Sequence, residues 1–194
     1  MAASLVAHTV RSGSLGVATV LREYRRRREI LADQEVEGFE ARLLDEVASS
    51  VGISVPEVKT IISDWIDYRP LSKLMSCRYP GVNRIFDRLR ASRRKIGILS
   101  DYPAHAKLFA LGLDADYVVS ALEVGVLKPH PRGLLKVLQL AGEGPETAVL
   151  VGDRAERDGE SARRAGVKAL IRTSTPLPEY VCFQTFEDSV FDGI

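Results

Sequence analysis

Two aspartates, Asp153 and Asp158, follow a short apolar stretch in the last third of the chain. The stretch Ala148–Val151 is rich in β-branched residues and is ended by Gly152, which is typical of a strand buried in a parallel sheet. The carboxylates therefore come at the carboxyl end of a strand, where open α/β sheets bind their ligands. Two carboxylates near one strand-to-helix turn can hold a hard cation such as Mg²⁺. The alternative is that Asp158 only caps the following helix.

Ser100 and Lys128 are two further side chains whose positions would suit chemistry. Ser100 and Asp101 follow the apolar stretch Ile96–Leu99, and the hydroxyl with the backbone N–H groups of the next helix could hold an anionic oxygen. Lys128 lies in a loop that two following prolines stiffen, and a fixed lysine is a good counter-charge for phosphate. Each side chain also has a plain interpretation, a helix cap for Ser100 and a surface lysine for Lys128.

Alternating helix and strand patterns begin near residue 79 and position these side chains. Apolar spacing predicts helices over 82–89, 103–111, 131–140 and after Asp158, strands over 96–99, 117–119, 148–151 and 168–171, and a short closing element over 186–191. Strands that alternate with helices indicate βαβ units with right-handed crossovers. The sequence therefore predicts an α/β fold with a parallel sheet.

The part of the chain before residue 79 is predicted to be all-helical. Helical patterns run over residues 1–28, with a Ser-Gly-Ser break, over residues 35–50, and from an N-cap at Ser54 through Trp65, which we expect in the core. The basic run Arg22–Arg28 invites a nucleic-acid interpretation. Acidic residues follow it at once, however, which favours a solvated helix face.

Composition narrows the class of protein. The 194 residues are 45% hydrophobic and 27% charged, which is ordinary for a soluble globular chain. The 27 basic and 26 acidic side chains nearly cancel, so neither nucleic acid nor a membrane surface is expected as the main partner. Cys77 and Cys182 stand far apart, which predicts neither a disulfide framework nor a zinc site. With no apolar run long enough to span a bilayer, we expect a cytoplasmic protein; its oligomeric state stays open.

The order of the three turns resembles that of the haloacid dehalogenase-like (HAD) hydrolase superfamily over residues 79–172. In that family the second motif is a Ser or Thr at a strand end, which Ser100 matches, and the third is a lysine, which Lys128 matches. The fourth is an acidic pair, which Asp153 and Asp158 match. The joint match is far more specific than any one motif.

The resemblance implies a fold and a domain arrangement. Residues 79–194 would form a Rossmann-like three-layer sandwich with a parallel sheet. The helical residues 1–78 look like the cap domain that these enzymes insert after their first strand, as in the phosphoglycolate-phosphatase-like branch. The first strand of the family's sheet would then be expected before Met1.

The first family motif, Asp-x-Asp-x-Thr, supplies the nucleophile and is absent from the chain. The stretch Asp114-Ala-Asp116 follows the second motif and leads into a predicted strand, which puts it at the wrong edge of the sheet. A second, mild departure is Asp101, where the family often has Asn. We therefore expect Met1 to be an internal methionine of a longer reading frame whose upstream part carries the missing strand and motif.

The function that the resemblance implies is Mg²⁺-dependent hydrolysis of a small phosphate monoester. Ser100, Asp101 and Lys128 would bind the phosphoryl group, with Ser100 and Lys128 acting in catalysis, and Asp153 and Asp158 would hold the metal. A fixed lysine and an acidic pair suit a phosphoryl group better than a neutral carbon–halogen bond, which argues against dehalogenation. The alternative is a catalytically inactive protein of this fold that binds phosphate or a phosphorylated ligand. A dinucleotide binder would need Gly-x-Gly-x-x-Gly, which does not occur.

Overall fold

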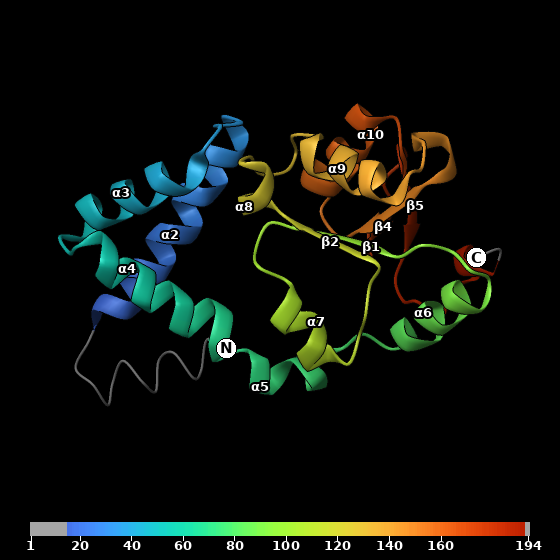
Figure 1. Ribbon diagram of the computed structural model, residues 1–194, viewed down its shortest axis with the longest axis horizontal. Coiled ribbons are helices and arrows are strands. Elements are labelled where there is room, and N and C mark those ends of the chain that lie inside the picture. Colours follow the sequence, from blue (N-terminus) through green and yellow to red (C-terminus); the bar gives the residue numbers. More distant parts are fainter. Residues whose placement is uncertain (1–14, 193–194) are drawn as a thin grey trace.

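The structure is a computed structural model that describes residues 15–192 (Figure 1). Its α-helices are α2 (Leu15–Asp33), α3 (Phe39–Val51), α4 (Val55–Ile62), α5 (Leu71–Leu74), α6 (Val82–Ala91), α7 (His105–Leu111), α8 (Ala121–Val124), α9 (Arg132–Ala141) and α10 (Glu160–Ala165). Its strands are β1 (Gly97–Ser100), β2 (Tyr117–Ser120), β3 (Val149–Gly152), β4 (Lys168–Arg172) and β5 (Val181–Phe183). The first half of the helix predicted over residues 1–28 lies outside the described range. Within that range, no helix is both long and apolar enough to cross a membrane.

Residues 15–77, which we call the helical segment, pack α2, α3 and α4 around one hydrophobic cluster. Ser54 begins α4 as predicted, because its hydroxyl accepts the Glu57 N–H while the Glu57 carboxylate accepts the Ser54 N–H at 2.9 Å. Trp65 is buried in this cluster, as predicted, but it lies in a π-helical turn (Ser63–Tyr68) that continues α4. Ala121 and Leu127 complete this cluster from outside the segment, so the helices share an apolar core with the strand-containing region.

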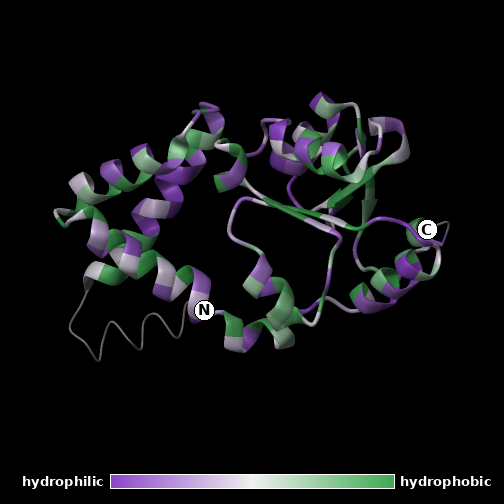
Figure 2. Ribbon diagram, in the orientation of Figure 1, coloured by the Kyte–Doolittle hydropathy of each residue, from purple (hydrophilic) through white to green (hydrophobic). Residues whose placement is uncertain are grey.

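The strands are all parallel, but they form two separate sheets within the described residues. β1 pairs with β2, and Ser100 lies opposite Ser120 at the carboxyl end of that pair. β3 pairs with β4, which pairs with β5. The strands are hydrophobic along most of their length (Figure 2), yet β1 and β3 each pair on only one side. Each of the two sheets thus has an unpaired parallel edge.

Helix α9 covers both sheets on one face. Gly133 lets α9 approach β1, because a Cβ there would stand 2.6 Å from Leu99 Cδ1. Leu134 and Leu138 of α9 pack in the same cluster as Leu150 of β3, with Leu99 against its edge. α6 lies on the other side, where Ile85 joins side chains of β4, β5 and the 3₁₀ turn Ser189–Phe191 (Figure 1). The two sheets therefore share one layered arrangement.

The predicted α/β fold with parallel strands is confirmed. The helices and strands expected after residue 79 are all present, with bounds that differ by one or a few residues. β5 was not predicted, because the three-residue stretch Val181–Phe183 is too short to give a periodic signal. The strands of residues 15–192 do not form a single continuous sheet. The division into a cap over 1–78 and a core over 79–194 stays a prediction.

Candidate functional site

The acidic turn after β3 is organised by Asp158. Its carboxylate folds back over the strand end, so that Oδ2 accepts the N–H groups of Asp153 at 3.2 Å and of Arg154 at 3.0 Å. Gly152 makes this possible, because a Cβ at that position would lie 2.4 Å from the Asp158 Cβ. Asp158 is buried, at 7% relative exposure. Asp158 therefore acts as a turn-forming acceptor within a π-helical turn (Ala155–Gly159), and it is the N-cap residue neither of that turn nor of α10.

Lys128, in the loop between α8 and α9, pairs with the same carboxylate. Its Nζ lies 2.6 Å from Asp158 Oδ1, and the two side chains are only 15% and 10% exposed. Lys128 is thus not a surface lysine. A pair this short and this far from water is stronger than an exposed pair, and removing one partner would leave an uncompensated charge.

The turn after β1 joins the arrangement through Asp101. Asp101 Oδ1 accepts the backbone N–H of Lys128 at 3.3 Å. The Ser100 hydroxyl accepts the N–H of Tyr102 at 3.2 Å, which holds the turn in shape. Contacts thus run from the β1 turn through Lys128 to the acidic turn after β3. The five predicted residues lie on three connected turns, although Ser100 and Asp153 bond only within their own turns.

Asp153 is the exposed member of the acidic pair. Its carboxylate makes no hydrogen bond or ion pair with the described residues, so both oxygens can accept a ligand. Asp158 offers less, because Lys128 and two backbone N–H groups already engage its oxygens. No group of three or more His, Cys, Asp or Glu side chains in the described part of the chain is arranged to hold a metal. The donor set fits a cation such as Mg²⁺ that takes one or two carboxylates and keeps its waters.

Asp114 and Asp116 lie at the amino ends of the strands, opposite to the ends that carry the candidate site, as predicted. Asp116 Oδ2 accepts the N–H of Ile96 at 2.7 Å, just before β1 begins, and Asp114 pairs with Arg90 at 3.2 Å. Both therefore stabilise the amino ends of β1 and β2. They are remote from Ser100 at the carboxyl end.

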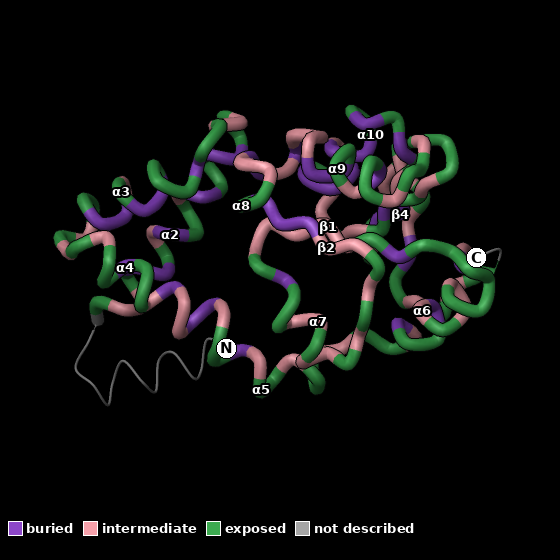
Figure 3. The backbone as a smooth tube through the Cα atoms, viewed as in Figure 1, coloured by how far each residue is buried: buried purple, intermediate pink, exposed green. Residues whose placement is uncertain are grey.

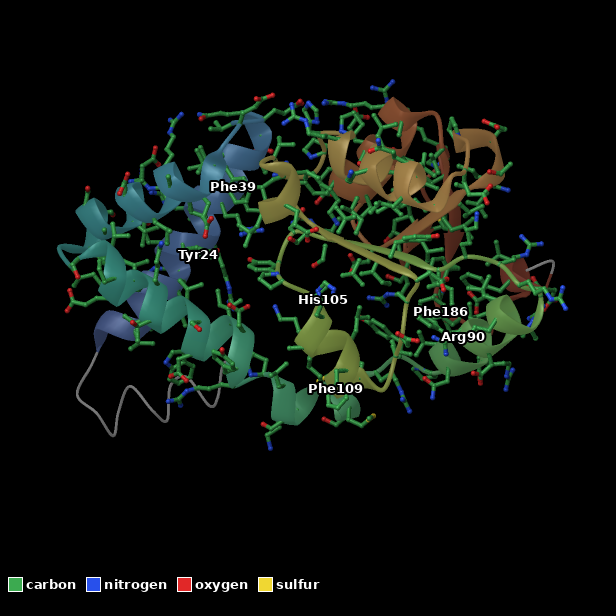
Figure 4. All side chains as sticks on the ribbon, viewed as in Figure 1. Tyr24, Phe39, Arg90, His105, Phe109 and Phe186 are labelled. Atoms are coloured by element: carbon green, nitrogen blue, oxygen red, sulfur yellow. The ribbon has the colours of Figure 1, made fainter. Side chains whose placement is uncertain are left out.

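The C-terminal half of α2 contributes residues that the sequence did not indicate. Arg28 donates a hydrogen bond from Nη2 to the carbonyl of Asp101, and its guanidinium carbon stands 4.0 Å from the centre of the Tyr102 ring. Glu29 forms a bidentate pair with Arg154, each N–O distance being 2.9 Å. Tyr24 and Phe39, labelled in Figure 4, belong to α2 and α3, and the guanidinium carbon of Arg28 lies 6.0 and 5.4 Å from the centres of their rings.

Arg28 corrects the prediction that the basic run Arg22–Arg28 is a solvated face. Arg26 and Arg27 do lie at the surface and pair with Glu23, but Arg28 is only 5% exposed. The signal was in the spacing: Arg28 falls on the buried stripe of α2. The charge pattern of the run predicts a solvated face, whereas the helical period places Arg28 with the buried residues Tyr24 and Leu31.

Electrostatics reinforces the contact between α2 and the acidic turn. Hydrogen bonds from Arg154, and then from Arg157, lower the pKa of Glu29 to about 2, against the opposing effect of burial. The same bonds raise the pKa of Arg154. Glu29 is therefore ionised through the neutral range, and the pair is charged whenever the site could bind an anion.

Comparisons with known proteins identify the family and several relatives of this chain. The family model of haloacid dehalogenase-like hydrolases matches residues 57–166, a range that contains every predicted site residue. Among characterised proteins, glyceraldehyde 3-phosphate phosphatase of Methanopyrus kandleri is 31% identical over 160 residues, 78% of this chain and 67% of the relative. Phosphoglycolate phosphatase of Aquifex aeolicus is 32% identical over 113 residues, 53% of each chain.

The structure of β-phosphoglucomutase from Clostridium difficile superposes with a TM-score of 0.64 at 14% identity, covering 91% of this chain and 89% of that one. At that identity the likeness shows the fold alone. The family match shows more: this chain belongs to the haloacid dehalogenase-like hydrolases. The relatives named above are phosphatases, and the chain spans between about half and two thirds of their length.

Proposed function

We propose that this chain is the larger part of a Mg²⁺-dependent phosphatase that acts on a small phosphate monoester. The observation that carries the proposal is the arrangement of Ser100, Asp101, Lys128 and the Asp153–Asp158 turn at the carboxyl ends of β1 and β3. The edge is the one at which open α/β sheets bind ligands. The names of the two relatives described above support a phosphorylated substrate of low molecular weight.

Each residue would have a defined role. Lys128 would present a positive charge and Ser100 a hydroxyl to the phosphoryl oxygens, and Asp101 would hold the Lys128 backbone in place. Asp153 would supply the main carboxylate for Mg²⁺, with Asp158 behind it to orient the turn. When bound, the ion would neutralise charge on the phosphoryl group. The helical segment would act as the cap that faces the substrate's leaving group.

This mechanism needs a carboxylate nucleophile beside Lys128. Of the described residues, Asp158 is the acid that Lys128 contacts, and it is already held by two backbone N–H groups. The unpaired edges of β1 and β3 support the hypothesis of a further strand: a parallel strand between them would end beside Lys128 and could bring this carboxylate. Val149 and Val151 of β3 are 49% and 42% exposed, although parallel strands are usually buried on both faces. β1, labelled in Figure 3, is likewise only partly buried.

The test begins with the coding DNA. Translating it in frame upstream of Met1 should reveal a strand-forming stretch that ends in Asp-x-Asp, and a stop codon with no such motif would contradict the hypothesis of a longer reading frame. The extended protein should hydrolyse p-nitrophenyl phosphate when Mg²⁺ is present, and Asp153→Ala should abolish the turnover. Removal of the metal with EDTA should do the same, and restored Mg²⁺ should reverse it.

The alternative function, a non-catalytic phosphate-binding protein, predicts a different result. Inorganic phosphate would then bind in isothermal titration calorimetry, while the extended protein would show no turnover of any phosphate ester offered. Lys128→Met should remove that binding. Turnover that depends on Asp153 would exclude this alternative.

A further inference from the structure

Two adjacent residues of α2, Arg28 and Glu29, contact both halves of the candidate site. Arg28 binds the carbonyl of Asp101, which follows β1. Glu29 binds Arg154 and Arg157, which follow β3. Within the described residues β1 and β3 are not hydrogen-bonded to each other. The contacts of Arg28 and Glu29 therefore link two sheets that are not joined by backbone hydrogen bonds.

The contact made by Glu29 is charged and partly shielded from water. Its carboxylate accepts a hydrogen bond from Arg157 Nη2 at 2.9 Å, and its backbone carbonyl accepts one at 3.3 Å. The Arg157 side chain is 7% exposed, and its Nε is buried without a partner. Arg157 therefore depends on Glu29, with Asp33 at 2.7 Å, to balance a charge that the interior would otherwise disfavour.

The contact made by Arg28 is constrained in a different way. Among the described residues no carboxylate pairs with Arg28, and its buried guanidinium is held by the Asp101 carbonyl, the Tyr24 hydroxyl at 3.1 Å and the Tyr102 ring. A buried cation is costly without such partners. A shift of α2 away from the β1 turn would remove two of them, so the position of the helix and the shape of the turn are coupled.

We propose that Arg28 and Glu29 are positioning residues that fix the β1 turn and the acidic turn relative to each other. Contacts then form a closed circuit: Arg28 to Asp101, Asp101 to Lys128, Lys128 to Asp158 in the acidic turn, and that turn back to Glu29 through Arg154. Its catalytic consequence rests on the proposed function, because the circuit sets where Lys128 and Asp153 stand. The circuit itself does not depend on any activity.

Hydrogen–deuterium exchange tests the circuit without substrate. The amides to follow are those of Tyr102 and Lys128 on one side and of Asp153 and Arg154 on the other, each of which donates to a side chain in these turns. Glu29→Gln keeps the shape of the side chain and removes its charge. We expect exchange at Asp153 and Arg154 to accelerate by about tenfold, with helix α3 unchanged.

Arg28→Met should accelerate exchange at Tyr102 and Lys128 to a similar extent, and Arg28→Lys should restore part of the protection because it keeps the charge but loses the planar fork. Matched controls lie earlier on α2, Glu23 before Glu29 and Arg26 before Arg28. Glu23 also pairs with two arginines, and Arg26 is one of them, but neither contacts the strands. Glu23→Gln and Arg26→Met should leave all four amides unchanged.

Two outcomes would overturn the proposal. One is no change at the four amides in Glu29→Gln. The other is an equal acceleration at every protected amide, which would mean that Glu29 only stabilises the fold as a whole. Binding of inorganic phosphate, measured on the same proteins, keeps this test separate from the proposed function. Local acceleration together with absent phosphate binding in the parent protein would support the circuit and reject the phosphatase, and weakened binding in Glu29→Gln but not in Glu23→Gln would support both.

Discussion

The helical segment and the strand-containing region are stabilised in different ways. In the helical segment, Val47 and Val58 are fully buried within one large hydrophobic cluster. In the strand-containing region the apolar residues divide into two smaller clusters, Val149 and Val151 are exposed, and helix α7 has no buried residue. Polar contacts through Lys128 and Asp158 connect its turns instead. One part thus rests on apolar packing and the other, near the site, on a few buried polar bonds.

The largest expected effect is loss of the Lys128–Asp158 pair. Lys128→Met should lower the free energy of unfolding by about 3 kcal/mol, because it leaves a buried carboxylate without its counter-charge. Denaturant unfolding would measure it. Arg42→Met, which breaks a more exposed pair with Glu46 in the helical segment, is the control and should have far less effect. Equal losses would show that the site pair is no more shielded than a surface pair.

A matched pair of valines tests the difference in packing directly. Val47→Ala, at 0% exposure, should destabilise by about 2 kcal/mol, since it removes buried methyl groups and leaves a cavity. Val151→Ala, at 42% exposure, should cost less than about 0.5 kcal/mol. Both are measured by the same unfolding curves. If Val151→Ala destabilises the protein as much as Val47→Ala does, another segment or molecule covers β3 in solution.

Acid should weaken the contact between the two regions before it weakens the apolar core. The pKa of Glu29 is depressed from 4.5 to about 2, so the stabilisation is fully present above pH 4.5 and is lost as the pH falls toward 2. Because Glu29 is half exposed, we expect no more than about 1 kcal/mol from this pair. Unfolding curves between pH 6 and 3 should show a smaller loss in Glu29→Gln than in the parent protein. Identical pH dependence in the two proteins would contradict this assignment.

The smallest effect should come from salt. Two outer ion pairs, Arg132 with Glu37 and Arg164 with Glu35, also link the regions and are more open to solvent than the Lys128–Asp158 pair. Exposed pairs are screened by ions. Raising the salt concentration should therefore reduce stability slightly in the parent protein and not in an Arg132→Gln and Arg164→Gln double variant. A loss as large as that of Lys128→Met would mean that these exposed pairs contribute as much stability as the buried Lys128–Asp158 pair.

Much of the local structure could be predicted because it depends on short-range patterns. Ser54 begins a helix because a hydroxyl and a glutamate three residues later satisfy free N–H groups. The positions of Ser100 and Asp153 at strand ends, and of Lys128 in a stiffened loop, follow from the sequence because apolar stretches, glycine and proline mark these places. Arg28 is buried although its neighbours are charged, because its spacing on α2 places it on the buried stripe.

The parallel α/β fold, the helical segment and the three turns each follow from the order of apolar and polar residues along the chain. The bond between Asp158 and Lys128, the contacts of Arg28 and Glu29 with both turns, and the unpaired edges of β1 and β3 arise from tertiary packing. These depend on how elements far apart in the sequence approach one another. A pair such as Glu29 and Arg154, 125 residues apart, leaves no periodic signal in either segment.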